Sequence, residues 1–147
     1  AEAKKIIEDY FANFPAISAY IEDTLASARE FGYVETLFGR RRYLPDINSK
    51  NGTVRSLAER TAINAPIQGT SADIIKLAMI NVSRRIAEEG LESRMVLQIH
   101  DELLFDTIPE EVERLGRIVR EEMENVIELS IPLTVECNYG NNWLEAH

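Results

Sequence analysis

The sequence predicts an α+β fold, in which an N-terminal pair of helices precedes a small antiparallel sheet backed by two long helices. Two observations predict this architecture. Apolar residues recur every three or four positions in several long segments, which is the spacing of one helix face. Between these segments lie short runs rich in β-branched and aromatic residues, bounded by glycine, proline or asparagine, as is typical of strands joined by turns.

The composition is that of a globular domain, because 45% of the 147 residues are hydrophobic and 28% are charged. No apolar run approaches the roughly 20 residues of a membrane-spanning helix, so we expect no membrane partner. The single cysteine, Cys137, permits no internal disulfide, which fits the cytoplasm. The chain starts at Ala1 without an initiator methionine and enters helix-like sequence at once, which indicates a piece of a longer protein.

The net charge of −9 is distributed unevenly along the chain. Residues 33–64 carry six basic and three acidic side chains, whereas residues 101–147 carry twelve acidic and three basic ones. The sum alone argues against a nucleic-acid partner, but the distribution matters more than the sum. The sequence therefore predicts a basic region within an acidic molecule.

The first half of the chain is predicted to hold a helical hairpin and a β-hairpin. Residues 3–14 form a helix that ends at Pro15, and a second helix follows from Ala16 to near Gly32. Strands at 33–37 and 40–44 flank a turn at Phe38–Gly39. Arg40, Arg41 and Arg42 alternate faces in such a strand, so they cannot all meet one ligand; they contact phosphate, or they form a solvated edge that resists aggregation.

After a loop at 46–52, a helix is predicted at 53–64, and Pro66 is expected to break it. Residues 67–70 form the connection, and Thr70 or Ser71 caps the next helix, which runs to Glu89. Arg60, Asn64 and Gln68 lie around this break. Their donors suit the N3 and O2 acceptors that every Watson–Crick pair presents in the minor groove, although they would equally satisfy backbone groups near the proline.

The C-terminal third is predicted to hold a strand pair, a helix and a further strand. Pro109 opens an amphipathic helix from Glu110 to about Leu129. A last strand at Leu133–Cys137 is expected to pair with the preceding hairpin, giving three or more strands, and Trp143 is expected to anchor the tail.

The most informative stretch is Met95 to Asp106, read as MVLQIHDELLFD. Two short apolar runs predict a β-hairpin with His100, Asp101 and Glu102 at its tip. These residues suit a turn poorly, since such turns favour pairs like Asn-Gly. They are polar because turns meet water, or they bind a hard cation such as Mg²⁺, which takes one or two carboxylates from a protein.

Three motifs in order give the chain a family resemblance: GRRRYLPDI, RTAINAPIQGTSADIIKLAMI and VLQIHDELLF resemble the family A DNA polymerases of bacteria. With the ending NNWLEAH, the resemblance covers essentially the whole chain. It implies that residues 1–66 are the end of the fingers subdomain and residues 67–147 the C-terminal half of the palm. It also implies a DNA-directed DNA polymerase of the bacterial cytoplasm and nucleoid, active in replication and repair.

The resemblance implies a role for each matching residue. Asp101 is similar to a catalytic metal ligand, Glu102 to its less critical neighbour, and His100 to a residue close to the primer terminus. Gln68 is similar to a minor-groove probe of the terminal base pair. The primer–template contacts beside it are implied for Asn64 and Arg60, and for Arg41 of the basic hairpin.

The implied reaction is attack of a primer 3′-hydroxyl on the α-phosphate of a dNTP, with two Mg²⁺ ions and release of pyrophosphate. The family's other catalytic aspartate, and its dNTP-binding Arg, Lys and Tyr, match no segment from Ala1 onward. We therefore expect the isolated chain not to polymerise and to bind metal weakly.

A stand-alone DNA-binding or scaffold module is the alternative function, and an unrelated Mg²⁺ phosphohydrolase ranks last. An apolar patch near Phe11, Phe14 or Tyr20 is expected to promote self-association.

Overall fold

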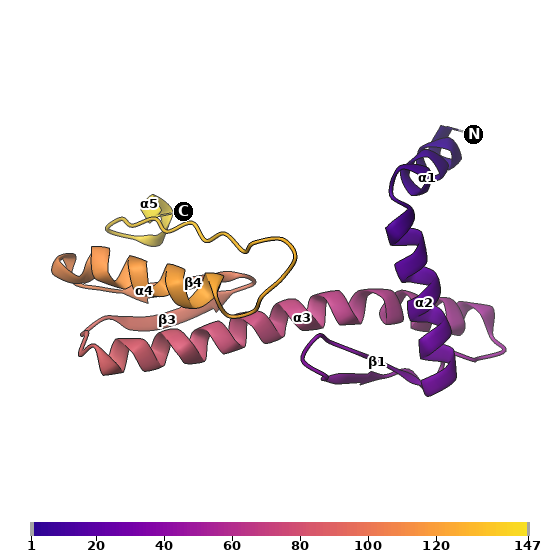
Figure 1. Cartoon of the computed structure of the whole chain (residues 1–147), viewed down its shortest axis with the longest axis horizontal. Coiled ribbons are helices and arrows are strands. Elements are labelled where there is room, and N and C mark those ends of the chain that lie inside the picture. Colours follow the sequence, from indigo (N-terminus) through magenta and orange to yellow (C-terminus); the bar gives the residue numbers. More distant parts are fainter. Residues whose placement is uncertain (1, 147) are drawn as a thin grey trace. The chain divides into compact units, whose positions relative to one another are not determined.

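The computed structural model describes residues 2–146, with side chains described for residues 5–146. The chain divides into two compact units, residues 1–70 and residues 71–147, which are described in turn (Figure 1). The class is α+β, as the sequence predicts. No helix in the described part of the chain has the length and apolarity that crossing a bilayer requires.

The first unit contains α1 (Glu2–Asn13), α2 (Pro15–Phe31), β1 (Tyr33–Glu35), β2 (Arg41–Tyr43) and the start of α3 (Gly52–Glu88). Proline at the first position of α2 and a left-handed Gly32 at its end, with φ 77°, set the boundaries of α2. The two strands are antiparallel, and Val34 lies opposite Arg42. The two predicted helices and the β-hairpin are therefore confirmed, with shorter strands than expected, and α1 lies at the N-terminal end of α2 (Figure 1).

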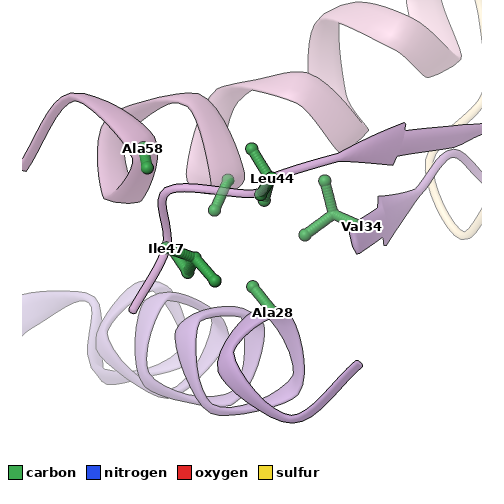
Figure 2. Packing of buried hydrophobic residues seen from close by; sticks show 6 residues of the cluster. Ala28, Val34, Leu44, Ile47 and Ala58 are labelled. Atoms are coloured by element: carbon green, nitrogen blue, oxygen red, sulfur yellow. The ribbon is translucent and has the colours of Figure 1, made fainter. Parts of the chain in front are cut away.

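The core of the first unit joins α2 and α3 to the β-hairpin. Its buried members come from α2, from β1, from the segment after β2 and from α3: Ala28, Val34, Leu44, Ile47, Ala58 and Ala62. Figure 2 shows Leu44 and Ile47 lying between the ribbons of the two helices, where the small side chains of Ala28 and Ala58 leave room. This packing fixes the hairpin relative to the part of α3 that precedes Pro66.

The predicted break at Pro66 is wrong, because this proline lies inside α3, a continuous helix of 37 residues. A proline inside a helix costs about 3 kcal/mol, since it removes one backbone hydrogen bond and crowds the preceding turn. Tertiary contacts on both sides of Pro66 offset this cost. The Tyr20 hydroxyl donates a hydrogen bond to the Ile63 carbonyl at 3.0 Å, and the Leu37 amide donates one to the Thr70 hydroxyl at 3.0 Å.

The predicted cap at Thr70 or Ser71 is wrong for the same reason, because both residues lie inside a helix and not at its start. Apolar side chains of α1 and of the residue that follows it are between 47% and 64% exposed: Ile6, Ile7, Tyr10 and Phe14. Phe11 and Tyr20 are half-buried. Self-association through this surface stays a prediction.

The second unit packs a β-hairpin against the end of α3 and against α4 (Val112–Glu124), as Figure 1 shows. Strand β3 (Arg94–Ile99) pairs antiparallel with β4 (Glu102–Asp106), and an irregularity in register lies between Met95 and Leu97. The core comprises residues of α3 and α4 with partly buried residues of the hairpin: Val82, Ile86, Leu115, Val119, Met95 and Phe105. The predicted hairpin is confirmed.

Two predictions for the C-terminal third are wrong. The long helix predicted from Glu110 to Leu129 is a 3₁₀ turn, η1 (Pro109–Glu111), followed by α4, which ends at Glu124. The segment at Leu133–Cys137 is not a strand, so each sheet in the described residues has two strands and not three. The Val135 amide instead donates to the Glu124 carboxylate at 2.9 Å, so a side chain replaces a strand partner.

The tail ends in α5 (Trp143–Ala146), and Trp143 is 47% exposed. The expectation that Trp143 anchors the tail stays a prediction. Glu145 also holds the tail, because its carboxylate accepts hydrogen bonds from the side chains of Asn141 and Asn142 at 3.0 and 2.8 Å.

Candidate nucleic-acid interface and carboxylate turn

A groove of about 470 Å³ in the first unit contains three of the four residues that the sequence predicts as DNA contacts. One wall is a face of α3 and the other is β2. The lining residues are Arg42, Leu57, Arg60, Thr61, Asn64, Ala65 and Gln68. Since the structure brings Arg60, Asn64 and Gln68 together, their grouping does not depend on the helix break that was predicted.

The continuity of α3 through Pro66 explains the groove. Arg60, Asn64 and Gln68 are spaced by four residues, as are Leu57, Thr61 and Ala65, so both rows follow one side of a helix with 3.6 residues per turn. A break after Asn64 would have turned Gln68 away from this face. The proline therefore lies within the part of α3 that lines the groove and does not end it.

The polar side chains of the groove are free to meet a ligand. Arg42, Arg60, Asn64 and Gln68 are all exposed, and among residues 5–146 none of the four has a hydrogen-bond or ion-pair partner. Their guanidinium and amide groups are all donors, and the amides add acceptors. The apolar part of the wall comes from Leu57, which is 60% exposed, and from Ala65.

Arg41, the fourth predicted contact, lies outside the groove lining. Its Nε donates to the Glu35 carboxylate at 2.6 Å, and its guanidinium lies 4.4 Å from the ring centroid of Tyr33. The hydrogen bond to Glu35 is the main reason why the pKa of Arg41 is raised above its ordinary value. Arg42, which sequence reasoning did not select, lines the groove instead. Alternation along the strand separates these neighbours; only the structure shows which face meets α3.

The carboxylate turn lies in the second unit, where His100 and Asp101 form a two-residue connection between the paired residues Ile99 and Glu102. His100 has φ 52°, a left-handed conformation that favours glycine at this position of a hairpin turn. A residue other than glycine held there costs of order 1–3 kcal/mol, and such positions cluster at functional sites. The Gln98 side chain supports the turn by donating to the His100 carbonyl at 2.8 Å.

The donor set at this turn fits part of a magnesium site. His100, Asp101 and Glu102 are all exposed, and carboxylate oxygens are the ligands that Mg²⁺ prefers. No group of three or more His, Cys, Asp or Glu residues in the described chain is arranged to hold a metal. Asp101 and Glu102 therefore fit as one or two ligands of an ion that takes the rest of its shell from other groups.

The base of the same hairpin is fastened by Glu111 of η1. Its carboxylate accepts hydrogen bonds from the Glu92 amide at 2.9 Å, the Ser93 amide at 2.9 Å and the Ser93 hydroxyl at 2.5 Å. Ser93 is only 3% exposed, and its hydroxyl also lies 2.7 Å from that of Thr107, the residue that follows β4. The hydrogen bond from Ser93 is the main reason why the pKa of Glu111 lies below its ordinary value.

Comparison with known proteins gives one consistent family. Residues 1–145 match the profile described as DNA polymerase family A. DNA polymerase I of Geobacillus stearothermophilus is 53% identical over 145 residues, which is 99% of this chain and 17% of that relative. DNA polymerase I of Pseudomonas aeruginosa is 52% identical over 146 residues, or 99% of this chain and 16% of that relative. The chain therefore spans about a sixth of the length of these relatives.

A solved structure is similar over nearly the whole chain. It is described as the POL domain of Pol1 from M. smegmatis in complex with DNA primer-template and dNTP. The TM-score is 0.96 and the sequence identity 50%, and the match covers 99% of this chain and 26% of that one.

Proposed function

Because the chain belongs to DNA polymerase family A, we propose that it forms part of a longer DNA-directed DNA polymerase that uses primer–template DNA and dNTPs. In this proposal residues 1–66 are the end of the fingers and residues 67–147 the C-terminal half of the palm. The shared family, the relatives' greater length and the DNA-bound complex of the similar structure support it. The bacterial cytoplasm and nucleoid are the matching location.

The single observation that carries the proposal is the groove of the first unit. Amide donors on Asn64 and Gln68 suit the minor groove, where N3 and O2 are acceptors in every Watson–Crick pair. They would therefore test the shape of a base pair without reading its sequence. The guanidinium groups of Arg42 and Arg60 suit phosphate or sugar oxygens beside the pair. Arg41, on the other face of β2, is proposed as an outer contact to the DNA backbone.

The carboxylate turn is proposed to serve the chemical step. Asp101 would supply an oxygen ligand for Mg²⁺, Glu102 would assist as its neighbour, and His100 would lie close to the primer terminus. Two bound Mg²⁺ ions would supply charge neutralisation at the attacking and leaving oxygens. The strained backbone of His100 and the hydrogen bond from Gln98 would hold Asp101 in place without a closing motion.

The proposed reaction is nucleotidyl transfer. The primer 3′-hydroxyl oxygen forms a bond to the α-phosphorus of the dNTP as the bond from that phosphorus to the bridging oxygen of pyrophosphate breaks. The hydroxyl proton leaves to solvent. This chain's described residues hold one end of the primer–template and a part of the metal shell, so the reaction requires further groups.

Primer extension tests the proposal. The complete protein encoded by the gene that carries this chain should extend a primer with Mg²⁺ and dNTPs, and a metal chelator should abolish extension. The isolated 147 residues should show no extension under the same conditions. A complete protein that is folded but never extends a primer would contradict the proposal, and extension by the isolated chain would contradict the incomplete metal shell.

A stand-alone DNA-binding module is the second candidate, because the groove is complete within the first unit. In this case the isolated chain should bind primer–template with an affinity that falls as salt rises. Replacing both Arg60 and Gln68 with alanine should abolish binding, whereas Ser56→Ala, on an exposed part of α3 outside the groove, should not. With a net charge of −9 we expect weak binding, and none at all would exclude this candidate.

A further inference from the structure

The turn that joins β1 to β2 contacts α3 immediately after Gln68. The Arg40 guanidinium donates a hydrogen bond to the Gly69 carbonyl at 3.0 Å. The Leu37 amide donates one to the Thr70 hydroxyl at 3.0 Å. Gly69 and Thr70, two successive residues of α3, thus accept hydrogen bonds from Arg40 and Leu37 of one turn. The hairpin therefore cannot slide along the helix without losing both hydrogen bonds.

Gly69 is the residue that lets the turn approach so closely. A Cβ atom at this position would lie 2.6 Å from the Thr36 Cγ2 atom and 3.3 Å from the Arg40 Nη2 atom. Side-chain carbons do not approach to less than 3.0 Å, so any larger residue displaces the turn. Gly69 is helical and does not have a positive φ. Close approach, and not backbone conformation, is therefore what requires glycine here.

The turn itself is held rigidly by Thr36. Its hydroxyl accepts hydrogen bonds from the Phe38 amide at 3.3 Å and the Arg40 amide at 3.2 Å. Its backbone closes the turn, since the Thr36 amide donates to the Arg40 carbonyl at 3.0 Å and the Gly39 amide to the Thr36 carbonyl at 3.0 Å. A displacement of the turn is consequently transmitted to β2, where Arg42 follows Arg40 by two residues.

We propose that this contact sets the distance between the two walls of the groove. It is called the seat below, and it consists of the turn Thr36–Arg40 together with Gly69 and Thr70 of α3. Arg42 lies on one wall and Gln68 on the other, and the seat is adjacent to both. Arg40 is accordingly a positioning residue for Gln68 and not a DNA contact. The inference deepens the proposed function, on which it rests: a groove of fixed width accepts a correctly shaped terminal pair and rejects a mismatched one.

The first test widens the groove and then restores it. In the complete protein, Gly69→Ala should lower the ratio of kcat/KM for matched over mismatched primer ends by about tenfold, equivalent to about 1.4 kcal/mol. Adding Thr36→Ser should restore the ratio, because serine keeps the hydroxyl and lacks the Cγ2 atom. Thr36→Ser alone should match the unaltered protein. An unchanged ratio in Gly69→Ala, or no rescue by Thr36→Ser, would overturn the proposal.

The second test is a double-mutant cycle between Arg40 and Gln68, which remains decisive if Gly69→Ala destabilises the protein. Arg40→Ala should lower the discrimination ratio in the unaltered protein and should have no further effect on it in a Gln68→Ala background. The proposal would be overturned if Arg40→Ala lowered kcat/KM equally for matched and mismatched ends, and by the same factor in both backgrounds. Arg40 would then be an independent contact. Arg84→Ala removes an exposed arginine of the second unit and serves as the control for lost charge.

Failure of this inference is distinguishable from failure of the proposed function. If the unaltered complete protein does not extend primers, the proposed function fails and the discrimination ratio does not exist. If it extends primers and the Gly69→Ala and Arg40→Ala variants discriminate as well as it does, only the seat is refuted.

Discussion

The groove of the first unit and the carboxylate turn of the second differ in how much of a site each supplies. The groove gathers four exposed donors from one helix face and one strand, and its width is held by bonds within the same unit. The turn presents Asp101 and Glu102, and the described residues offer no third ligand beside them. The proposed recognition of DNA therefore needs residues of this unit alone, whereas the proposed chemical step requires groups from elsewhere.

The two regions also use their charges differently. In the second unit two arginines are paired with acids of α4 and of the residue that follows α3: Arg85 donates to Glu89 at 2.9 Å and to Glu122 at 2.6 Å, and Arg114 lies 2.8 Å from Glu89. The hydrogen bond with Glu89 is the main reason why the pKa of Arg85 is raised. In the groove Arg42 and Arg60 have no such partners within the described residues. The net charge of the whole chain thus says little about where an anion can bind.

The largest effect is expected at the turn. Asp101→Ala in the complete protein should lower kcat for primer extension by more than about a hundredfold, equivalent to about 2.7 kcal/mol, because it removes the oxygen ligand that the proposed function assigns to the transition state. The KM for primer–template should change little, since the groove is untouched. Single-turnover kinetics with saturating dNTP measure the chemical step directly.

Asp106→Ala is the matched control, because Asp106 is an exposed aspartate at the end of β4 that is remote from the turn. Its kcat should stay near that of the unaltered protein. Equal losses in the two variants would mean that any carboxylate of the hairpin matters only for its charge, and would remove the distinction between the turn and the rest of the strand.

An intermediate effect is expected in the groove. Gln68→Ala should raise the KM for primer–template and reduce discrimination against mismatched ends by about 1–3 kcal/mol, the typical value of a good base-edge contact. The rate of the chemical step with a matched primer should fall much less than in Asp101→Ala. Ser56→Ala, exposed on α3 but outside the groove, should leave both quantities unchanged. A loss confined to kcat would place Gln68 with the turn and break the comparison.

The parts of both regions that depend on local pattern could be predicted from the sequence. Two apolar runs around three ionisable residues predict the hairpin and its tip, and alternation in a strand separates Arg41 from Arg42. Spacing by four residues places Arg60 and Asn64 on one helix face. These features depend on the period of each element and not on what packs against it.

What could not be predicted depends on tertiary contacts. Pro66 favours a helix end locally, but α3 continues through it and is held on both sides by hydrogen bonds at Ile63 and Thr70. Leu133–Cys137 has the pattern of a strand, but its backbone meets the Glu124 side chain in place of a neighbouring strand. The choice of Arg42 over Arg41 as a groove residue required knowing which face of β2 meets α3.

The smallest effect, and a selective one, is expected at Glu111, which fastens the base of the hairpin that carries the turn. Its pKa is lowered in the folded chain by the hydrogen bond from Ser93, by that from the Glu92 amide and by further contacts. A lowered folded pKa means that this stabilisation is fully present above the unfolded pKa of 4.5 and is lost as the pH falls through the folded value. Hydrogen exchange at Glu92 and Ser93, corrected for intrinsic rates, should therefore become faster below about pH 4.5.

Glu111→Gln should remove this pH dependence, and Glu110→Gln, next to it in η1, should retain it. The groove should not respond in either variant, because the bond network of Glu111 lies entirely in the second unit; a matching change at Gly69 or Thr70 would show that the two regions are not independent.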